Sequence, residues 1–346
     1  RQRYGYRPMS LIRKRKLTHN QIRRIASNAP VDEASLATGV IVAHFGKQLD
    51  VQVTALADSE QVSNTLSVGQ IYRCHTRTNL PMLATGDKVK ISFDDTAQLG
   101  RIESLLARDC LITRPDRYHK IKPVAANVEL LAIVFAPLPK AATSLIDRYL
   151  LIAHINGVTP LLVLNKADLL PDFPDVAHLY QEYIALGYHG VQTSVPTGDG
   201  LADLQGYIGD KFSIFAGQSG VGKSSLINHL LPHALQDINV ISSGSKLGQH
   251  TTTTSRLIAY DPSDLTQGGI IDTPGIREYG IWHLSPDDIL AAFSELAPLA
   301  SLCRFRDCKH SENSKGCALW QAVADGQVLA RRVLSLTQLQ EETRQA

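Results

Sequence analysis

A glycine-rich run in the second half of the chain restricts the possible folds more than any other feature. Residues 217–224 read G-Q-S-G-V-G-K-S and match the phosphate-loop pattern G-x-x-x-x-G-K-S at each fixed position. An apolar stretch of strand character, 212–216, comes before the run, and Leu226, Ile227 and Leu230 follow it at helical spacing. Glycines let the backbone approach so closely that successive N–H groups point at one phosphate. The run therefore predicts a strand–loop–helix unit that binds a nucleoside triphosphate.

The contacts expected within this run follow from the chemistry of each side chain. Lys223 carries the ammonium group that would bridge the β- and γ-phosphate oxygens, and the Ser224 hydroxyl would bind Mg²⁺. The residues expected to contact the nucleotide here are Gly217, Gln218, Ser219, Gly220, Val221, Gly222, Lys223, Ser224 and Ser225.

The base is selected by the segment Asn165-Lys166-Ala167-Asp168, which directly follows an apolar strand-like stretch. A carboxylate at Asp168 can accept two hydrogen bonds from guanine, whereas adenine offers no such donor pair and would leave the carboxylate desolvated and unpaired. The stem of Lys166 can lie along the purine, and Asn165 can tie this segment to the phosphate loop. Ser194 and Val195 resemble a backbone loop that contacts guanine O6. We therefore expect GTP and GDP as the ligands.

Two further segments suit a switch that responds to the γ-phosphate. In Asp272-Thr273-Pro274-Gly275, the carboxylate would hold Mg²⁺ through water and the Gly275 N–H would contact the γ-phosphate. Between this segment and the phosphate loop, a polar run offers candidates for the threonine that reaches Mg²⁺ only when GTP is bound, and an ordinary polar loop is the alternative reading of that run. The candidate catalytic residues are His250, Thr251, Thr252, Thr253, Asp272 and Gly275.

These segments occur in an order that differs from that of a Ras-like G domain, where the phosphate loop comes first. Here Asn165–Asp168 precedes the phosphate loop, and Asp272–Gly275 comes last. A sheet tolerates new chain ends where the old ends lie close together. Apolar strands also alternate with helical stripes from Val128 onward, which favours a parallel sheet. We predict a central, circularly permuted α/β P-loop GTPase domain over residues 120–280.

The amino-terminal third has a different pattern. Short alternating strands separated by turn residues fill residues 36–113 and predict a small β-barrel of the OB-fold type, although an SH3-like barrel gives the same pattern. Its basic residues, with Tyr72 and Phe93 between them, are compatible with a groove for RNA, and equally with an ordinary solvated surface. Before the barrel, residues 1–35 form a basic extension suited to a polyphosphate partner; a solubilising tail is the alternative, and Met9 could be the natural start.

The carboxyl-terminal region, 281–346, is expected to be helical around one metal-binding loop. Four ligand-type residues lie within 15 positions, in a pattern that suits a closed tetrahedral Zn²⁺ site: Cys303, Cys308, His310 and Cys317. The odd count of five cysteines argues against a disulfide framework and for a reduced, cytoplasmic chain. We find no apolar run near the ~20 residues that a membrane span requires and expect no membrane contact.

A barrel, a permuted G domain and a Cys/His module together resemble the bacterial ribosome small-subunit-dependent GTPase A family, from about residue 13 to 330. The resemblance implies a late assembly factor that binds the 30S subunit and its 16S rRNA, hydrolyses GTP to GDP and phosphate when stimulated by that subunit, and then leaves. We expect it to act as a monomer. In this family the gap between the histidine and the last cysteine is usually one residue shorter, so the loop 311–316 is expected to differ while the ligands stay.

One position departs from the Ras pattern. Ile276 stands where a Ras-like protein has a glutamine that orients the attacking water, so the isolated chain should hydrolyse GTP slowly. The resemblance assigns that role to His250, and a solvated loop histidine is the alternative. A GTP-gated RNA-binding module with little turnover therefore stays open as a second reading of the whole chain.

Overall fold

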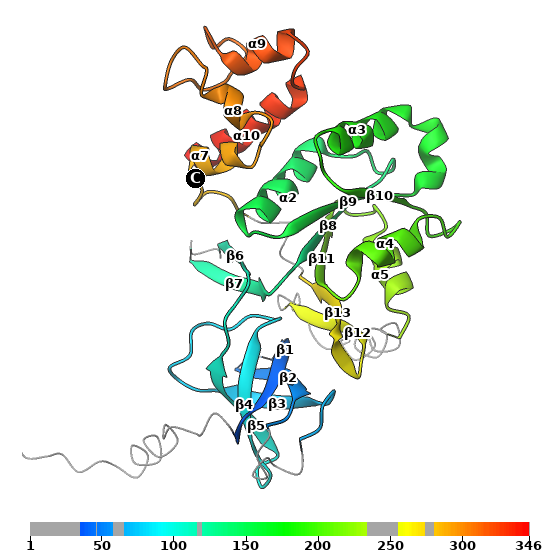
Figure 1. Ribbon diagram of the computed structural model, residues 1–346, viewed down its shortest axis with the longest axis vertical. Helices are drawn as coiled ribbons and strands as arrows, with labels where there is room; N and C mark the ends of the chain where they lie inside the picture. The colour runs from blue at the N-terminus through cyan, green and yellow to red at the C-terminus, as the bar shows by residue number, and fades with distance from the viewer. Residues whose placement is uncertain are drawn as a thin grey trace, which may run out of the picture.

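The structure is a computed structural model, and it describes residues 35–45, 47–57, 66–115, 120–233, 255–273 and 280–345. Of the basic extension predicted for residues 1–35, all but Ser35 lies outside these ranges. The chain runs from a barrel through a central layered domain to a helical carboxyl-terminal module (Figure 1). Among the described residues, no helix is both long enough and apolar enough to span a bilayer.

Five strands form the barrel; the strand at 88–94 alternates buried and more exposed residues as a half-buried strand does, whereas the first strand, at 37–45, is buried over most of its length. They are β1 (Ala37–Phe45), β2 (Gln48–Ala55), β3 (Ile71–Thr76), β4 (Lys88–Asp94) and β5 (Leu99–Leu105). Their order is β1-β2-β3-β5-β4, and β4 pairs back with β1 to close the barrel. All pairs are antiparallel except β3 with β5. The predicted OB-type barrel is confirmed; its last strand is one that the sequence pattern did not single out.

A two-stranded hairpin, β6 (Leu111–Pro115) and β7 (Ile121–Ala126), links the barrel to the central domain. The sequence pattern did not predict it, because its strands carry few apolar residues in alternation. Ala125 and Ala126 are fully buried where β7 passes between the two domains. The link is therefore packed between the domains.

The central domain is a six-stranded arrangement in the order β10-β9-β8-β11-β13-β12. All neighbours are parallel except β12, which runs antiparallel to β13. The strands are β8 (Leu130–Phe135), β9 (Thr159–Asn165), β10 (Gly190–Thr193), β11 (Phe212–Gly217), β12 (Arg256–Asp261) and β13 (Asp264–Asp272). Strands β8 and β11 are buried along their whole length, which is why they read as continuous apolar runs.

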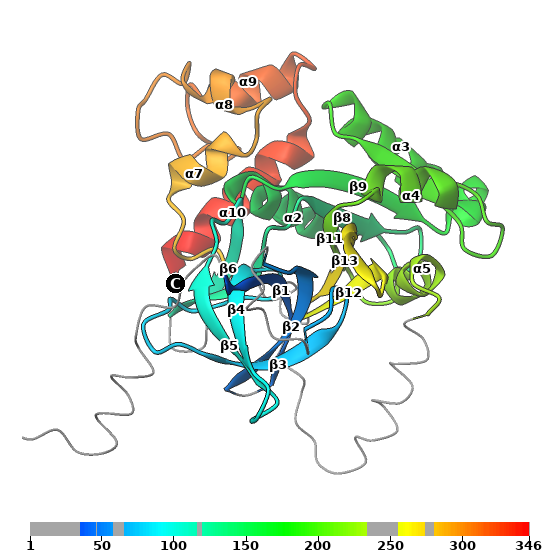
Figure 2. The same cartoon turned by 60° about the horizontal axis from the view of Figure 1, so that its bottom comes forward.

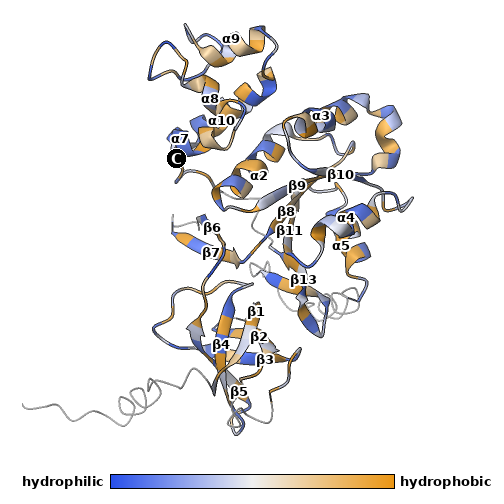
Figure 3. Ribbon diagram, in the orientation of Figure 1, coloured by the Kyte–Doolittle hydropathy of each residue, from blue (hydrophilic) through white to orange (hydrophobic). Residues whose placement is uncertain are grey.

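Helices cover both faces of this sheet (Figure 1). Helices α2 (Thr143–Ile155) and α3 (Pro174–Ala185) pack into one core, and α4 (Leu201–Ile208) and α5 (Lys223–Leu230) pack into another. A short 3₁₀ helix, η2 (Ala167–Asp172), follows β9. Helices α2 and α3 show apolar and polar segments in turn, as amphipathic helices at a surface do (Figure 3). The permuted order of the nucleotide-binding segments is thus compatible with the usual α/β arrangement of one sheet between two layers of helices.

The carboxyl-terminal module contains α7 (Pro286–Ala291), α8 (Ala297–Ala300), α9 (Ala318–Ala324) and α10 (Ala330–Gln345). Ser285 caps α7 in a capping box with Asp288. Apolar side chains of this module, including Ile289, Phe293 and Leu336, belong to the same buried core as Tyr149 of α2. The module is therefore packed on the central domain along its α2 and α3 face.

Candidate functional site

The predicted nucleotide-binding segments meet at one edge of the central sheet. Strands β9, β10, β11 and β13 all run in the same direction, so their carboxyl ends share that edge. These strands end at Asn165, Thr193, Gly217 and Asp272. Ligands of open α/β sheets bind at this edge. Segments 165–168, 193–195 and 217–225 are thereby brought together from three separate parts of the chain.

Asn165 joins its segment to the phosphate loop. It is buried, and its Nδ2 donates to the backbone oxygen of Val221 at 2.9 Å while its Oδ1 accepts from the Thr193 hydroxyl at 3.1 Å. Gly222 lies directly beneath it with φ +94°, and a Cβ there would come within 2.3 Å of the Asn165 Nδ2. Only glycine fits between the two segments.

The side chains of Lys166 and Asp168 leave the same turn and contact different segments of the site. The Lys166 Nζ donates to the backbone oxygens of Leu138 at 2.7 Å and Gly220 at 2.8 Å. The Asp168 Oδ1 accepts from the Ser194 hydroxyl at 2.7 Å. Ser194 is fully buried and so holds the carboxylate in one orientation. Sequence reasoning gave Ser194 a backbone contact with the base and missed this side-chain contact.

The phosphate loop wraps back on itself. The Lys223 Nζ donates to the backbone oxygens of Gly217 at 2.8 Å and Gln218 at 2.7 Å. A Cβ on Gly217 would lie 2.1 Å from the oxygen of Val134 on β8, so the loop starts at close backbone contact. Ser219, Gly220, Ser224 and Ser225 are exposed, so the open side of the loop presents small residues. Val221 is buried beneath it and Val195 is half-buried against the α4–α5 core.

The two predicted switch segments are described only in part. Asp272 is the last residue of β13, with its side chain exposed, and Thr273 is buried beside it. Gly275 and the candidates His250, Thr251, Thr252 and Thr253 lie outside the described residues.

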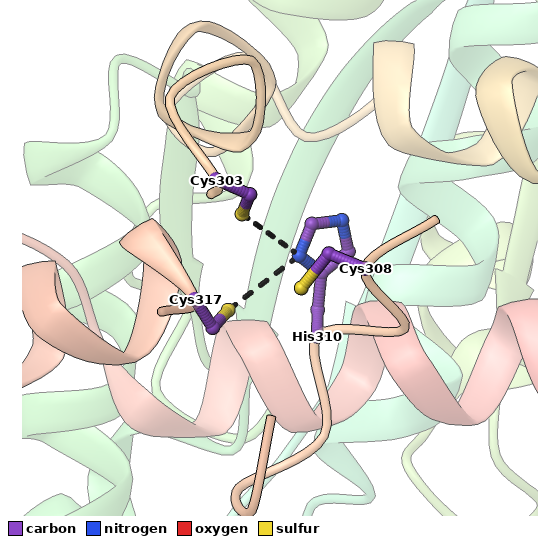
Figure 4. Close-up of side chains that lie close together, drawn as sticks. All are labelled: Cys303, Cys308, His310 and Cys317. Atoms are coloured by element: carbon purple, nitrogen blue, oxygen red, sulfur yellow. Dashed lines mark hydrogen bonds between the residues drawn. The ribbon is translucent and has the colours of Figure 1, made fainter. Parts of the chain in front are cut away.

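The four predicted metal ligands converge in the carboxyl-terminal module (Figure 4). One ligand atom from each of them lies within 4.8 Å of the others: Cys303, Cys308, His310 and Cys317. The His310 Nδ1 is 3.6 Å from the sulfurs of both Cys303 and Cys317. A tetrahedral ion with bonds of about 2.3 Å to sulfur and about 2.0 Å to nitrogen places such atoms about 3.6 Å apart. These two sulfur–nitrogen distances fit a tetrahedral ion, and the structure carries a Cys3His cluster compatible with a structural metal.

The surroundings of the cluster also suit a metal. Cys317 stands at the N-cap of α9, and its sulfur lies 3.6 Å from the His310 Nδ1. The Ala318 N–H donates to the Cys303 sulfur at 3.3 Å. Burial raises the pKa of the Cys317 thiol to about 11 and lowers that of His310. Burial thus keeps the imidazole neutral, as a ligand must be, and a cation would be needed to stabilise the buried thiolate.

Comparison with known proteins agrees with this geometry. Residues 105–282 match the family model of the RsgA GTPase. A protein of Alcanivorax borkumensis named small ribosomal subunit biogenesis GTPase RsgA is 44% identical over 305 residues, covering 88% of this chain and 83% of that protein. A Vibrio cholerae protein of the same name is 40% identical over 344 residues, covering 93% and 84%.

The chain belongs to the RsgA GTPase family.

Two solved structures resemble this fold over 90% of the chain. YjeQ from Thermotoga maritima aligns with a TM-score of 0.66 at 29% identity, covering 90% of this chain and 99% of that one. YloQ, described as a circularly permuted GTPase, aligns with a TM-score of 0.64 at 26% identity, covering 90% and 96%. The resemblance found in the sequence and the permuted fold class are both confirmed.

On the barrel of this RsgA family member, the structure changes the reading of the aromatic residues. Tyr72 and Phe93 pack edge to face at 5.2 Å and lie half-buried against the barrel core, so they offer no stacking platform. Phe45 is 51% exposed instead, and the Arg73 guanidinium lies 4.3 Å from its ring centroid. Arg73 also pairs with Asp50. Phe45 is the last residue of β1, where the strand leaves the barrel core.

Proposed function

We propose that this chain is a GTPase that acts in the late assembly of the 30S ribosomal subunit. The observation that carries the proposal is that Asn165 hydrogen-bonds to the phosphate loop while Ser194 orients the carboxylate of Asp168 at the same sheet edge, an arrangement that suits a guanine nucleotide. The names of its relatives in Alcanivorax borkumensis and Vibrio cholerae support the ribosomal role. Contact with 16S rRNA, a monomeric state and a cytoplasmic location belong to the same proposal.

In this proposal the base is read by Asp168, with Lys166 along the purine and Ser194 and Val195 beside O6. The β- and γ-phosphates lie on the backbone of residues 217–225, with Lys223 against the phosphate oxygens. Gly275 contacts the γ-phosphate. His250 orients the attacking water and one of Thr251, Thr252 and Thr253 responds to GTP, since Ile276 cannot hydrogen-bond to water.

Two metals complete the proposal. Mg²⁺ fits the oxygen ligands that Ser224 and Asp272 offer at the sheet edge, and bound with GTP it would neutralise phosphate charge. Zn²⁺ fits the Cys3His cluster, because its sulfur–nitrogen spacing of 3.6 Å suits tetrahedral bonds of zinc length. The ion would hold residues 303–317 in place, where local apolar packing is sparse.

The test is the rate of phosphate release from GTP with purified 30S, 50S or 70S particles added. We expect slow release by the chain alone and at least about tenfold faster release with 30S particles. Specific 30S binding without any gain in turnover would favour the GTP-gated RNA-binding module. The ribosomal role would be refuted if 30S particles neither bound to the chain nor stimulated its turnover of GTP.

A further inference from the structure

Strand β12 is held by the barrel at both of its ends. The Thr85 hydroxyl donates to the backbone oxygen of Ser255, the residue before β12, at 3.0 Å. The Gln52 Nε2 donates to the backbone oxygen of Pro262, the residue after β12, at 2.6 Å. Both side chains belong to the barrel, and they reach 170 and 210 residues along the chain to make these contacts.

These two side chains are built into the barrel. Thr85 is 0% exposed and Gln52 is 3% exposed. The Gln52 Nε2 also donates to the oxygen of Gly69 at 2.8 Å. Gly69, with φ +84°, lies so close to Ser263 that a Cβ would come within 2.4 Å of its oxygen. A buried polar group keeps its partner because losing it strands an unsatisfied atom, so these contacts resist separation of barrel and strand.

At its first residue the same strand is paired with both domains. Arg256 at the start of β12 pairs with Ala43 of β1 on one side and with Asp272 of β13 on the other. Ala43, Arg256 and Asp272 therefore form one row across three strands, from the barrel to the sheet edge, and β12 continues the barrel as part of one eleven-stranded sheet (Figure 2). The backbone of the carboxylate proposed for Mg²⁺ stands two strands from the barrel.

The end of β13 is also constrained from the barrel side. Gly86, next to Thr85, has φ +93°, and a Cβ there would come within 2.2 Å of the Ala126 oxygen and 3.2 Å of the Ile271 side chain. Ile271 directly precedes Asp272 in β13. Packed contacts of this kind transmit displacements as a unit, because such interfaces do not deform continuously.

We propose that the barrel positions β12, and through it Asp272, for GTP hydrolysis, with Gln52 and Thr85 as the positioning residues. The inference rests on the proposed function, since it assumes that Asp272 serves a GTP-hydrolysing site. It adds that an RNA bound to the barrel and the nucleotide at the sheet edge affect each other through β12. That coupling is reciprocal: a nucleotide that holds β12 in the position needed for GTP hydrolysis also strengthens RNA binding to the barrel, and bound RNA favours the same position of β12.

The experiment uses the full chain and three sets of variants. Thr85→Val removes the hydroxyl while keeping the shape, Gln52→Leu removes the amide, and the double variant removes both contacts. Thr85→Ser keeps the hydroxyl and tests for rescue. Thr54→Val is the matched control, because its hydroxyl donates to Thr38 within the barrel at 3.3 Å. Single-turnover GTP hydrolysis, KM for GTP and GDP affinity are measured with and without 30S particles.

We expect kcat of the double variant to fall by at least about fivefold, with KM and GDP affinity within about twofold of the unmodified chain. Thr85→Val alone should show part of that fall, and Thr85→Ser and Thr54→Val should behave as the unmodified chain does. Retained GDP affinity and a cooperative thermal transition identify folded variants, and Thr85→Val, being isosteric, serves where the double variant fails to fold.

Unchanged kcat in folded Thr85→Val and Gln52→Leu, with normal turnover by the unmodified chain, overturns this inference alone. An equal loss in Thr85→Ser or Thr54→Val also overturns it, because packing rather than the two hydrogen bonds would then be responsible. An unmodified chain that does not hydrolyse GTP at all refutes the proposed function and this inference with it.

Discussion

Arg332 of α10 offers a measure of how firmly the carboxyl-terminal module is attached. Its side chain is 1% exposed, and its guanidinium donates to Asp147 of α2, itself fully buried, and to Glu295 of its own module at 2.6 Å. The guanidinium also lies 4.2 Å from the ring centroid of Phe293. Burial alone would lower the pKa of Arg332, and the two carboxylates outweigh burial and raise it, so the group stays charged.

Replacing Arg332 by Met keeps most of the side-chain volume but leaves Asp147 as an uncompensated buried charge. Loss of one partner from a buried ion pair costs about 3–5 kcal/mol. Arg148 and Glu342 pair between the same two helices, but their side chains are 21% and 41% exposed. Breaking an exposed pair of this kind costs about 0–1 kcal/mol. We therefore expect Arg332→Met to destabilise the module by at least about 2 kcal/mol more than Arg148→Met does.

Urea unfolding followed by tryptophan fluorescence measures this difference directly. Both tryptophans of the chain, Trp282 and Trp320, lie in the carboxyl-terminal module, so their signal reports its unfolding. Adding Asp147→Asn to Arg332→Met should recover part of the lost stability, because the stranded charge is then removed. A loss below about 1 kcal/mol in Arg332→Met, or an equal loss in the two arginine variants, would refute the reasoning.

Three further predictions concern the nucleotide and metal sites. Asp168→Asn should weaken GTP binding by at least about tenfold and favour xanthosine triphosphate, whose C2 oxygen can accept from the new amide; an unchanged GTP preference measured by competition would contradict the assignment. Metal analysis of protein purified without chelator should find one Zn²⁺ per chain, and Cys317→Ser should lose the ion while GDP affinity stays nearly intact. A zinc content near zero in the unmodified chain would refute the zinc site. The chain should bind 30S particles more tightly with a non-hydrolysable GTP analogue than with GDP at one fixed salt concentration, and Gly275→Ala should reduce that difference in affinity. Equal 30S affinities with the two nucleotides would rule out a nucleotide-dependent switch.

The contact network bears on that last prediction. The predicted switch segment Asp272–Gly275 leads within a few residues to Ile281, which is buried in the core shared by the central domain and the carboxyl-terminal module. Arg331 adds a second tie to α3 through Glu182, at 2.7 Å. A change at Gly275 must therefore act against a module already packed on α2 and α3. Any reorientation would involve these helices together with the module.

The sequence alone determined the chemistry of the sites. The phosphate loop, the Asn165–Asp168 segment and the four metal ligands were predicted residue by residue. The barrel was predicted from its short alternating strands, the permuted G domain from the order of the motifs, and the family from the combination of these parts. Such motifs are readable because neighbouring residues dictate their backbone: glycines permit the loop, and an apolar run dictates the strand before it. Strand β8, a continuous apolar run, lies at the start of the region from Val128 onward where the sequence predicted alternating strands and helices.

Only the tertiary structure decided how these parts are joined. Ser194 orients Asp168, Thr85 and Gln52 hold β12, and Arg332 joins α10 to Asp147 across 185 residues of chain. Each pairing depends on which surfaces the fold brings together, and a threonine or a glutamine carries no local sign of a partner that lies so far along the chain. Strand β12 was missed for a related reason: its burial depends on pairing with β1 and β13 and leaves a weak apolar pattern of its own.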